Sequence, residues 1–132
     1  MADVTDTITP ISGTKRIVCR FTNVYVDTGE TAAIKIDKST LIGPDGTEPT
    51  SLVIEEISWD IQGYTSVRID WDHTTDDEIV KLGAGSGSMS WTDVGGLKDP
   101  GSAGGTGDVV FTTSGATAGN SYTITIVARL KD

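Results

Sequence analysis

The stretch NSYTITIVARLK, residues 120–131, alternates between apolar and polar residues with a period of two. One parity carries Tyr122, Ile124, Ile126, Ala128 and Leu130. The other parity carries Thr123, Thr125, Arg129 and Lys131, and Val127 is its only large apolar residue. Successive side chains of a β-strand point to opposite faces, so this pattern predicts a strand with one buried and one solvated face.

Seven further stretches suit strands, and no stretch sustains the 3.6-residue period of a helix. The eight predicted strands cover residues 15–27, 31–37, 52–61, 64–72, 78–82, 86–92, 108–113 and 120–131. No helix is long enough to connect parallel strands. We therefore predict an all-β fold, an antiparallel eight-stranded β-sandwich that is jelly-roll-like. The Cys…Trp…Cys spacing of immunoglobulin domains is missing, which places that topology second.

Short turn signals between neighbouring strands predict two hairpins. Asp27-Thr-Gly29 would join residues 15–27 to residues 31–37, with a change of face near Asn23. Gln62-Gly63 would join residues 52–61 to residues 64–72, so that Trp59 and Trp71 face each other in the core. Glu55 interrupts the apolar parity of its strand.

The first residues of the chain show little periodicity. They combine threonines, acids and isolated isoleucines with Pro10, which is typical of an extended segment that needs a partner to hold it. We predict an extended N-terminal arm over residues 1–14 and a β-sandwich domain over residues 15–132.

Charge and cysteine content limit the classes of partner. Nineteen acidic residues against ten basic ones give a net charge of −9, which disfavours binding to nucleic acid or to anionic membranes. The single cysteine, Cys19, cannot form an intrachain disulfide and fits a buried position. The polar opening Met-Ala-Asp and the lack of a long apolar run lead us to expect synthesis and folding in a cytoplasm.

The residues that carry chemistry do not form a recognisable catalytic motif. Acids crowd residues 70–78, where oxygen ligands could hold Ca²⁺, but the EF-hand order is absent and a solvated acidic loop is the favoured interpretation. His73 has no nucleophile motif beside it, and the glycines of residues 83–87 lack the features of a phosphate-binding loop. We predict no catalytic residues, no metal and no cofactor.

The three tryptophans leave a second function open. Trp59 and Trp71 lie on apolar parities and are predicted in the core, whereas Trp91 lies at a strand end beside a glycine-rich loop. An exposed Trp91 could stack on a sugar, as in a carbohydrate-binding or adhesin module.

Several phrases of the chain resemble those of small structural proteins of tailed bacteriophages. They are Trp59-Asp-Ile-Gln-Gly-Tyr64, Gly95-Gly-Leu-Lys-Asp-Pro100, Gly104-Gly-Thr-Gly-Asp108 and Ser121-Tyr-Thr-Ile-Thr-Ile126, in an acidic, Thr/Gly-rich β chain with an N-terminal arm. Within that group the chain looks most like a capsid decoration (cement) protein.

This resemblance implies a non-enzymatic virion protein that is synthesised in a host cytoplasm and lies on the outer surface of the capsid. The alternative sugar-binding or adhesin module would then belong to a phage tail or receptor-binding apparatus. The partners of a decoration protein would be neighbouring major capsid subunits and sister copies in a trimer or dimer, with no nucleic acid and no membrane. We expect the arm and the glycine-rich loops to make these contacts. The candidate contact residues are Thr5, Thr7, Ile8, Pro10, Ile11, Trp91, Leu97 and Pro100.

Overall fold

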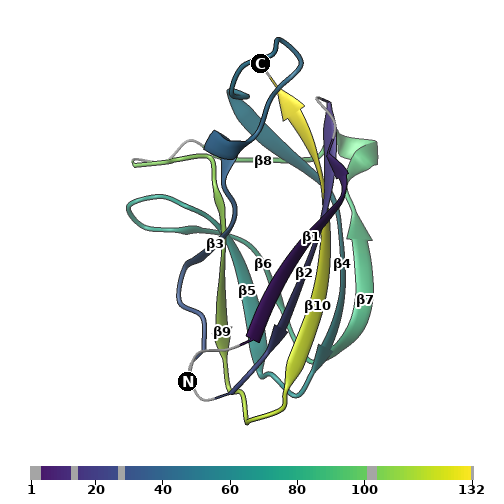
Figure 1. Ribbon diagram of the computed structural model, residues 1–132, viewed down its shortest axis with the longest axis vertical. Helices are drawn as coiled ribbons and strands as arrows, with labels where there is room; N and C mark the ends of the chain where they lie inside the picture. The colour runs from purple at the N-terminus through teal and green to yellow at the C-terminus, as the bar shows by residue number, and fades with distance from the viewer. Residues whose placement is uncertain (1–3, 13–14, 27–28, 101–103, 132) are drawn as a thin grey trace.

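A computed structural model describes residues 4–12, 15–26, 29–100 and 104–131. Over these ranges the chain forms ten strands and two short 3-10 helices (Figure 1). The strands are β1 Val4–Ser12, β2 Arg16–Val24, β3 Ala33–Ile36, β4 Ser51–Gln62, β5 Ser66–Trp71, β6 Asp77–Leu82, β7 Gly85–Ser90, β8 Leu97–Lys98, β9 Val109–Ser114 and β10 Ser121–Lys131. The helices are η1 Lys38–Thr40 and η2 Thr92–Val94. Neither helix has the length or the hydropathy to cross a bilayer.

The strands form two packed antiparallel sheets. The large sheet has the order β1-β2-β10-β4-β7, with β8 also paired to β4, and the small sheet has the order β3-β9-β5-β6. Without β1 and β8, the eight remaining strands have the order of a jelly roll, two interleaved Greek keys split over two sheets. These eight are the predicted strands, so the predicted fold class is confirmed.

The two predicted hairpins are wrong. β2 and β4 belong to the large sheet, whereas β3 and β5 belong to the small one. Each short connection therefore crosses between sheets, which buries both apolar faces against each other. At the second crossing Gly63 has a φ of +91°, and a Cβ there would lie 2.3 Å from the Asn120 side chain. Trp59 and Trp71 consequently lie in opposite sheets.

Two short segments add strands to the jelly roll. The residues predicted as an arm are extended over β1, which pairs with β2 from Val4↔Val24 to Ser12↔Ile17 and forms an edge of the large sheet. β8 is a two-residue strand beside β4. These two segments account for the difference between the ten observed strands and the eight predicted ones. β8 is too short, and the sequence of β1 is too irregular, for alternation to reveal a strand.

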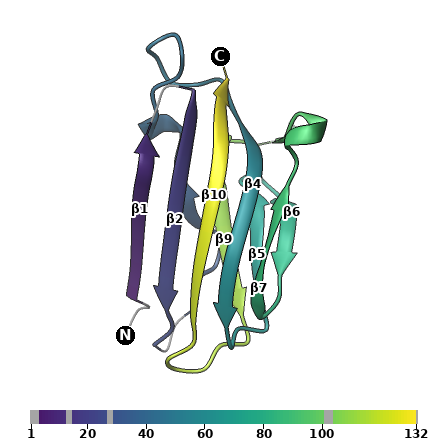
Figure 2. The ribbon, with the colours of Figure 1, turned by 90° about the vertical axis from the view of Figure 1, so that its right-hand side faces the viewer.

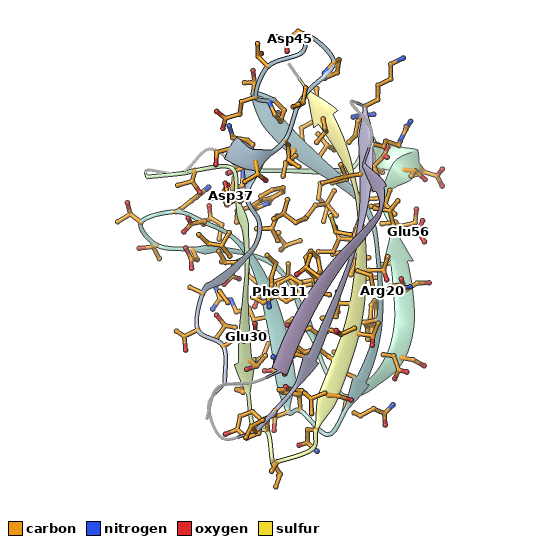
Figure 3. The ribbon with its side chains drawn as sticks, in the orientation of Figure 1. Arg20, Glu30, Asp37, Asp45, Glu56 and Phe111 are labelled. Carbon is orange, nitrogen blue, oxygen red and sulfur yellow. The ribbon has the colours of Figure 1, made fainter. Side chains whose placement is uncertain are left out.

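The core lies between the sheets and follows the alternation of β10. The five β10 residues predicted to be buried are all at most 3% exposed. Phe111 of the small sheet packs edge-on against Phe21 of the large sheet, with ring centroids 5.3 Å apart, and Figure 3 shows Phe111 between the sheets. Cys19 is buried as predicted.

Two irregular positions have different outcomes. The interruption at Glu55 is a β-bulge, because Val127 pairs with Glu56 and Ala128 with Ile54, which leaves Glu55 as the extra residue. The predicted change of face at Asn23 is wrong. β2 continues in register through Asn23, whose buried side chain accepts a hydrogen bond from the Tyr64 hydroxyl.

Candidate functional site

The outer face of the large sheet presents ordered rows of hydroxyl groups. One row runs across β2, β10, β4 and β7 as Thr22, Thr123, Asp60 and Ser86. The next row runs as Arg20, Thr125, Ser58 and Ser88. We call these eight residues the hydroxyl face. Figure 2 looks onto the large sheet, and none of the described elements covers this side.

Charge is distributed unevenly between four strands of this sheet and the rest of the chain. The four strands that carry the hydroxyl face contain the basic residues Arg16, Arg20, Arg129 and Lys131 and the acidic residues Glu55, Glu56 and Asp60. Sixteen acidic and six basic residues remain for the rest of the chain. Figure 3 shows Arg20 and Glu56 on the outer side of the large sheet. The hydroxyl face is thus close to neutral in a strongly acidic protein.

The bulge in β4 carries an ion-pair network at the upper border of this face. Arg16 Nε donates to Glu55 Oε1 at 2.7 Å, and Arg129 Nη1 lies 3.9 Å from Glu55 Oε2. The hydrogen bond from Arg16 lowers the pKa of the Glu55 carboxyl below its ordinary value, against the opposing effect of burial. Because the bulge turns Glu55 out of the core, one carboxylate can meet two arginines.

The predicted acidic segment, residues 70–78, separates into individual contacts. Asp70 is 3% exposed and accepts a 2.7 Å hydrogen bond from Arg68 Nε. Burial raises the pKa of Asp70, which the hydrogen bond from Arg68 only partly opposes. Asp72 accepts a hydrogen bond from the Thr106 hydroxyl at 2.9 Å. Among the described residues, no three His, Cys, Asp or Glu side chains come together as ligands for a metal ion.

His73 lies between two carboxylates, one at the start of β6 and one in the loop after β8. Its side chain is fully buried, with Nε2 2.6 Å from Asp99 Oδ1 and Nδ1 2.8 Å from Asp77 Oδ2. The contact at Nδ1 lacks hydrogen-bond alignment. His73 N–H donates to Asp76 Oδ1, which ties the turn between β5 and β6. The contact with Asp99 spans 26 residues, and no local signal in the sequence predicts it.

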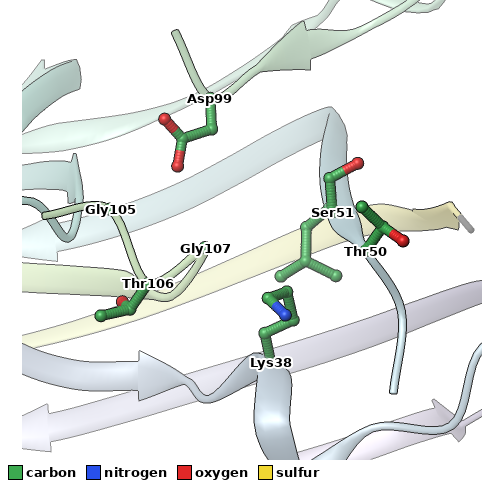
Figure 4. A pocket seen from close by; sticks show the side chains of 8 residues that line it. Lys38, Thr50, Ser51, Asp99, Gly105, Thr106 and Gly107 are labelled. Atoms are coloured by element: carbon green, nitrogen blue, oxygen red, sulfur yellow. The ribbon is translucent and has the colours of Figure 1, made fainter. Parts of the chain in front are cut away.

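A polar cavity of about 400 Å³ opens beside this histidine at the end of the sandwich (Figure 4). It is lined by Lys38, Thr50, Ser51, Leu52, Asp99, Gly105, Thr106 and Gly107. Lys38 Nζ donates to Glu48 at 2.8 Å and to the carbonyl of Pro49 at 3.0 Å, so its charge is already compensated. The imidazole holds Asp99 in place, and the lining otherwise offers hydroxyl and backbone groups. This arrangement suits structural tethering of three loops.

The candidate contact residues from the sequence occupy separate places. Thr5, Thr7, Ile8, Pro10 and Ile11 all lie in β1. Thr7 is exposed and borders a hollow of about 240 Å³ between β2 and β3.

The remaining three candidates lie beyond β4, toward the edge of the large sheet opposite β1. Trp91 and Leu97 are half-buried and pack against the core, and Pro100 is exposed. Because β2, β10 and β4 separate β1 from β8, the structure does not bring the two groups together.

The tryptophans contribute mainly to the core. Trp71 is 3% exposed, and Trp59 and Trp91 are half-buried against core residues. The hydroxyl face contains no aromatic residue. Within the described chain, these positions do not form a flat aromatic platform.

The opposite pKa shifts of Asp70 and Glu55 predict opposite pH dependences. The pKa of folded Asp70 lies above its ordinary value of 3.8, so wild-type stability falls as pH rises through the interval between these two values. Asp70→Asn does not titrate, and its free energy of unfolding should therefore rise relative to wild type across that interval. Urea unfolding from below pH 3.8 to neutral pH measures the difference.

Glu55→Gln is the matched control. The pKa of folded Glu55 lies below its ordinary value of 4.5, so the wild type gains stability as pH rises through that lower interval and the variant does not. The free energy of unfolding of the variant should therefore fall relative to that of the wild type as pH rises through this interval. Parallel pH profiles for the two variants would contradict the assignment of these shifts.

Comparisons with known proteins show little similarity. No protein-family model matches the sequence, and no curated protein matches it. Among solved structures, a cupin superfamily protein from Desulfitobacterium hafniense aligns with 100% of this chain and 82% of its own chain, at 10% identity and a TM-score of 0.39. A likeness at this level carries no argument about activity or partners.

Proposed function

We propose that this protein is a non-enzymatic virion component that decorates and stabilises the outer surface of a bacteriophage capsid by binding neighbouring major capsid subunits. The observation that carries this proposal is the hydroxyl face: a broad, uncovered and nearly neutral surface on a protein of net charge −9. The resemblance of the sequence to small phage structural proteins supports the same function.

The distribution of charge supports one orientation on the shell. The face with balanced charge can approach another protein without strong repulsion, whereas the acidic loops would point outward and limit adhesion to anionic envelopes. Serine and threonine hydroxyls both donate and accept hydrogen bonds, so rows of them can match the polar surface of a partner.

Repetition on the shell would supply the strength of attachment. A polar face of this kind makes modest contacts for each copy. Once a copy or an oligomer is attached at one point, its other contact surfaces are held at a high effective concentration near the shell. Several weak contacts therefore add up to strong overall attachment. Attachment therefore does not require a deep pocket or a cofactor in this chain.

The proposal predicts that a charge at the centre of the hydroxyl face weakens attachment. Thr123 is exposed in the middle of its row, and Thr123→Glu would place an uncompensated carboxylate in the docked interface. Burying such a charge costs more than about 1.4 kcal/mol, so affinity for undecorated shells should fall at least about tenfold. Cosedimentation with shells of the encoding phage, purified without this protein, measures the change.

Thr117→Glu provides the matched control. Thr117 is exposed in the loop before β10, away from the hydroxyl face, and the substitution adds the same charge. Equal binding by both variants would reject docking through the hydroxyl face. Failure of the wild type to bind shells, together with saturable binding to a glycan array that Trp91→Ala abolishes, would favour the adhesin function instead.

A further inference from the structure

Both sheets end in edge strands, and three of the four edges have an interrupted register. β1 contains Pro10, which lacks a backbone N–H, and its register shifts between Ile8 and Ile11. β3 has only four residues, and its register shifts between Ile34 and Ile36. Proline, bulges and short length are the devices that prevent an edge strand from pairing with another chain.

β6 is protected by charge as well as by a bulge. It carries Asp77, Glu78 and Lys81, and its pairing with β5 shifts register between Ile69 and Asp70. A strand from another molecule would have to pair with these charges and with an irregular backbone. This edge is therefore also unfavourable for strand addition.

β7 has none of these protective features. It has six residues, contains neither proline nor charge, and pairs with β4 in unbroken register from Glu56↔Ser90 to Ile61↔Gly85. It is the last strand of the large sheet (Figure 1), so its far side has no partner among the described strands. Five of its six residues are exposed.

The inner side of this edge leaves apolar groups incompletely covered. Trp59 lies across β7 at Gly87, where an added Cβ would come within 2.8 Å of the indole ring. Trp59 and Met89 are half-buried at this border of the core. A further strand beside β7 would cover them and add apolar burial to the backbone hydrogen bonds.

The lack of charge along this edge favours a second copy of the chain as its occupant. Residues 83–92, GAGSGSMSWT, contain no charged residue, although the chain carries a net charge of −9. Two copies can therefore meet along β7 without repulsion between like charges in the two strands. The nearest carboxylates of the hydroxyl face lie on β4, and those of the two copies would be three strand spacings apart, roughly 14 Å. That exceeds the screening length of about 8 Å at physiological ionic strength.

We propose that β7 pairs antiparallel with β7 of a second copy about a two-fold axis normal to the sheet. Such an axis keeps outward residues on one side, so the serines Ser86, Ser88 and Ser90 of each copy meet those of the other, while Gly87 and Met89 meet on the inner side. The large sheet becomes continuous across both copies, and the two hydroxyl faces form one surface. This pairing goes beyond the proposed function and does not depend on it.

Light scattering on the purified protein tests the pairing without any capsid. The wild type should have twice the mass of the 13.8 kDa chain. Ser88→Lys places like charges close together at the seam and should halve the mass. Thr123→Lys adds the same charge on the interior strand β10 and should remain dimeric. A monomeric wild type, or a dimer that Ser88→Lys leaves intact, would overturn the proposal.

A cross-linking experiment avoids dependence on the folding of the lysine variant. Cysteine is introduced singly at Ser86, Ser88 or Ser90, with Thr123→Cys as the control, and the native Cys19 is only 6% exposed. Each variant is oxidised alone and in pairwise mixtures, because the two-fold axis places an outward serine opposite either itself or a neighbouring outward serine. At least one edge sample should form a covalent dimer, since paired strands bring the Cα atoms of facing residues within about 5.5 Å. Cross-linking in none of the edge samples, or in the control to the same extent, would refute the pairing.

Discussion

Replacing Phe111 with alanine is expected to lower the free energy of unfolding by about 3–5 kcal/mol, the largest effect of any single core change we foresee. Phe111 is 0% exposed and lies in β9, the interior strand that pairs with β3 and β5. Its ring meets Phe21 at 5.3 Å and Tyr122 at 5.9 Å, and both partners belong to the opposite sheet. The substitution therefore opens a cavity at the contact between the two layers.

Urea denaturation of wild type and variant measures this loss. Phe111→Leu keeps much of the volume and should cost clearly less than the alanine variant. Val94→Ala removes apolar atoms from a side chain that is 76% exposed, and its effect should stay within about 0.5 kcal/mol. A loss below about 1 kcal/mol for Phe111→Ala would mean that the two sheets do not depend on this contact.

The second large effect concerns a buried ion pair beside that ring. Lys35 and Glu30 form a salt bridge in which each side chain is only 8% exposed, and Lys35 Nζ lies 5.8 Å from the centre of the Phe111 ring. The Tyr122 hydroxyl donates to the same carboxylate of Glu30. Lys35→Met would leave this carboxylate buried without its cation and should cost about 3–5 kcal/mol.

A double-mutant cycle separates the interaction energy between Lys35 and Glu30 from the cost of leaving one of them without its partner. Adding Glu30→Gln to Lys35→Met removes the orphaned charge and keeps an acceptor for Tyr122. The double variant should therefore recover most of the lost stability. If the Lys35→Met variant alone is within about 1 kcal/mol of the wild type, then water or another cation compensates Glu30.

The sequence was sufficient for the strands but not for their assignment to sheets. Alternation identified all eight jelly-roll strands, because each buries one face and local spacing records that burial. Gln62-Gly63 suits a hairpin as well as a crossing between sheets, since the same backbone conformation at a glycine serves both. The choice depends on which arrangement buries both apolar faces, and that is a property of the whole chain.

The candidate site was harder to predict because it depends on contacts between residues that are distant in the sequence. Trp91 and Leu97 are predicted as contacts because they lie in or beside glycine-rich loops, and the structure places both half-buried against the core. The partner of His73, Asp99, lies 26 residues away in a loop that no periodic pattern positions. The unprotected edge of β7 becomes visible only when the four sheet edges are compared, because a Gly/Ser stretch in a sequence resembles an ordinary loop.

The position of β10 has a consequence for biogenesis. β10 lies between β2 and β4 and joins them, yet it follows every other strand of the large sheet in the chain. During translation, the backbone groups of β2 and β4 that face β10 stay unpaired until β10 has been synthesised. Such long-range pairing is slow and leaves the nascent polypeptide open to aggregation. Efficient folding would thus benefit from chaperones that protect β2 and β4 until β10 is available.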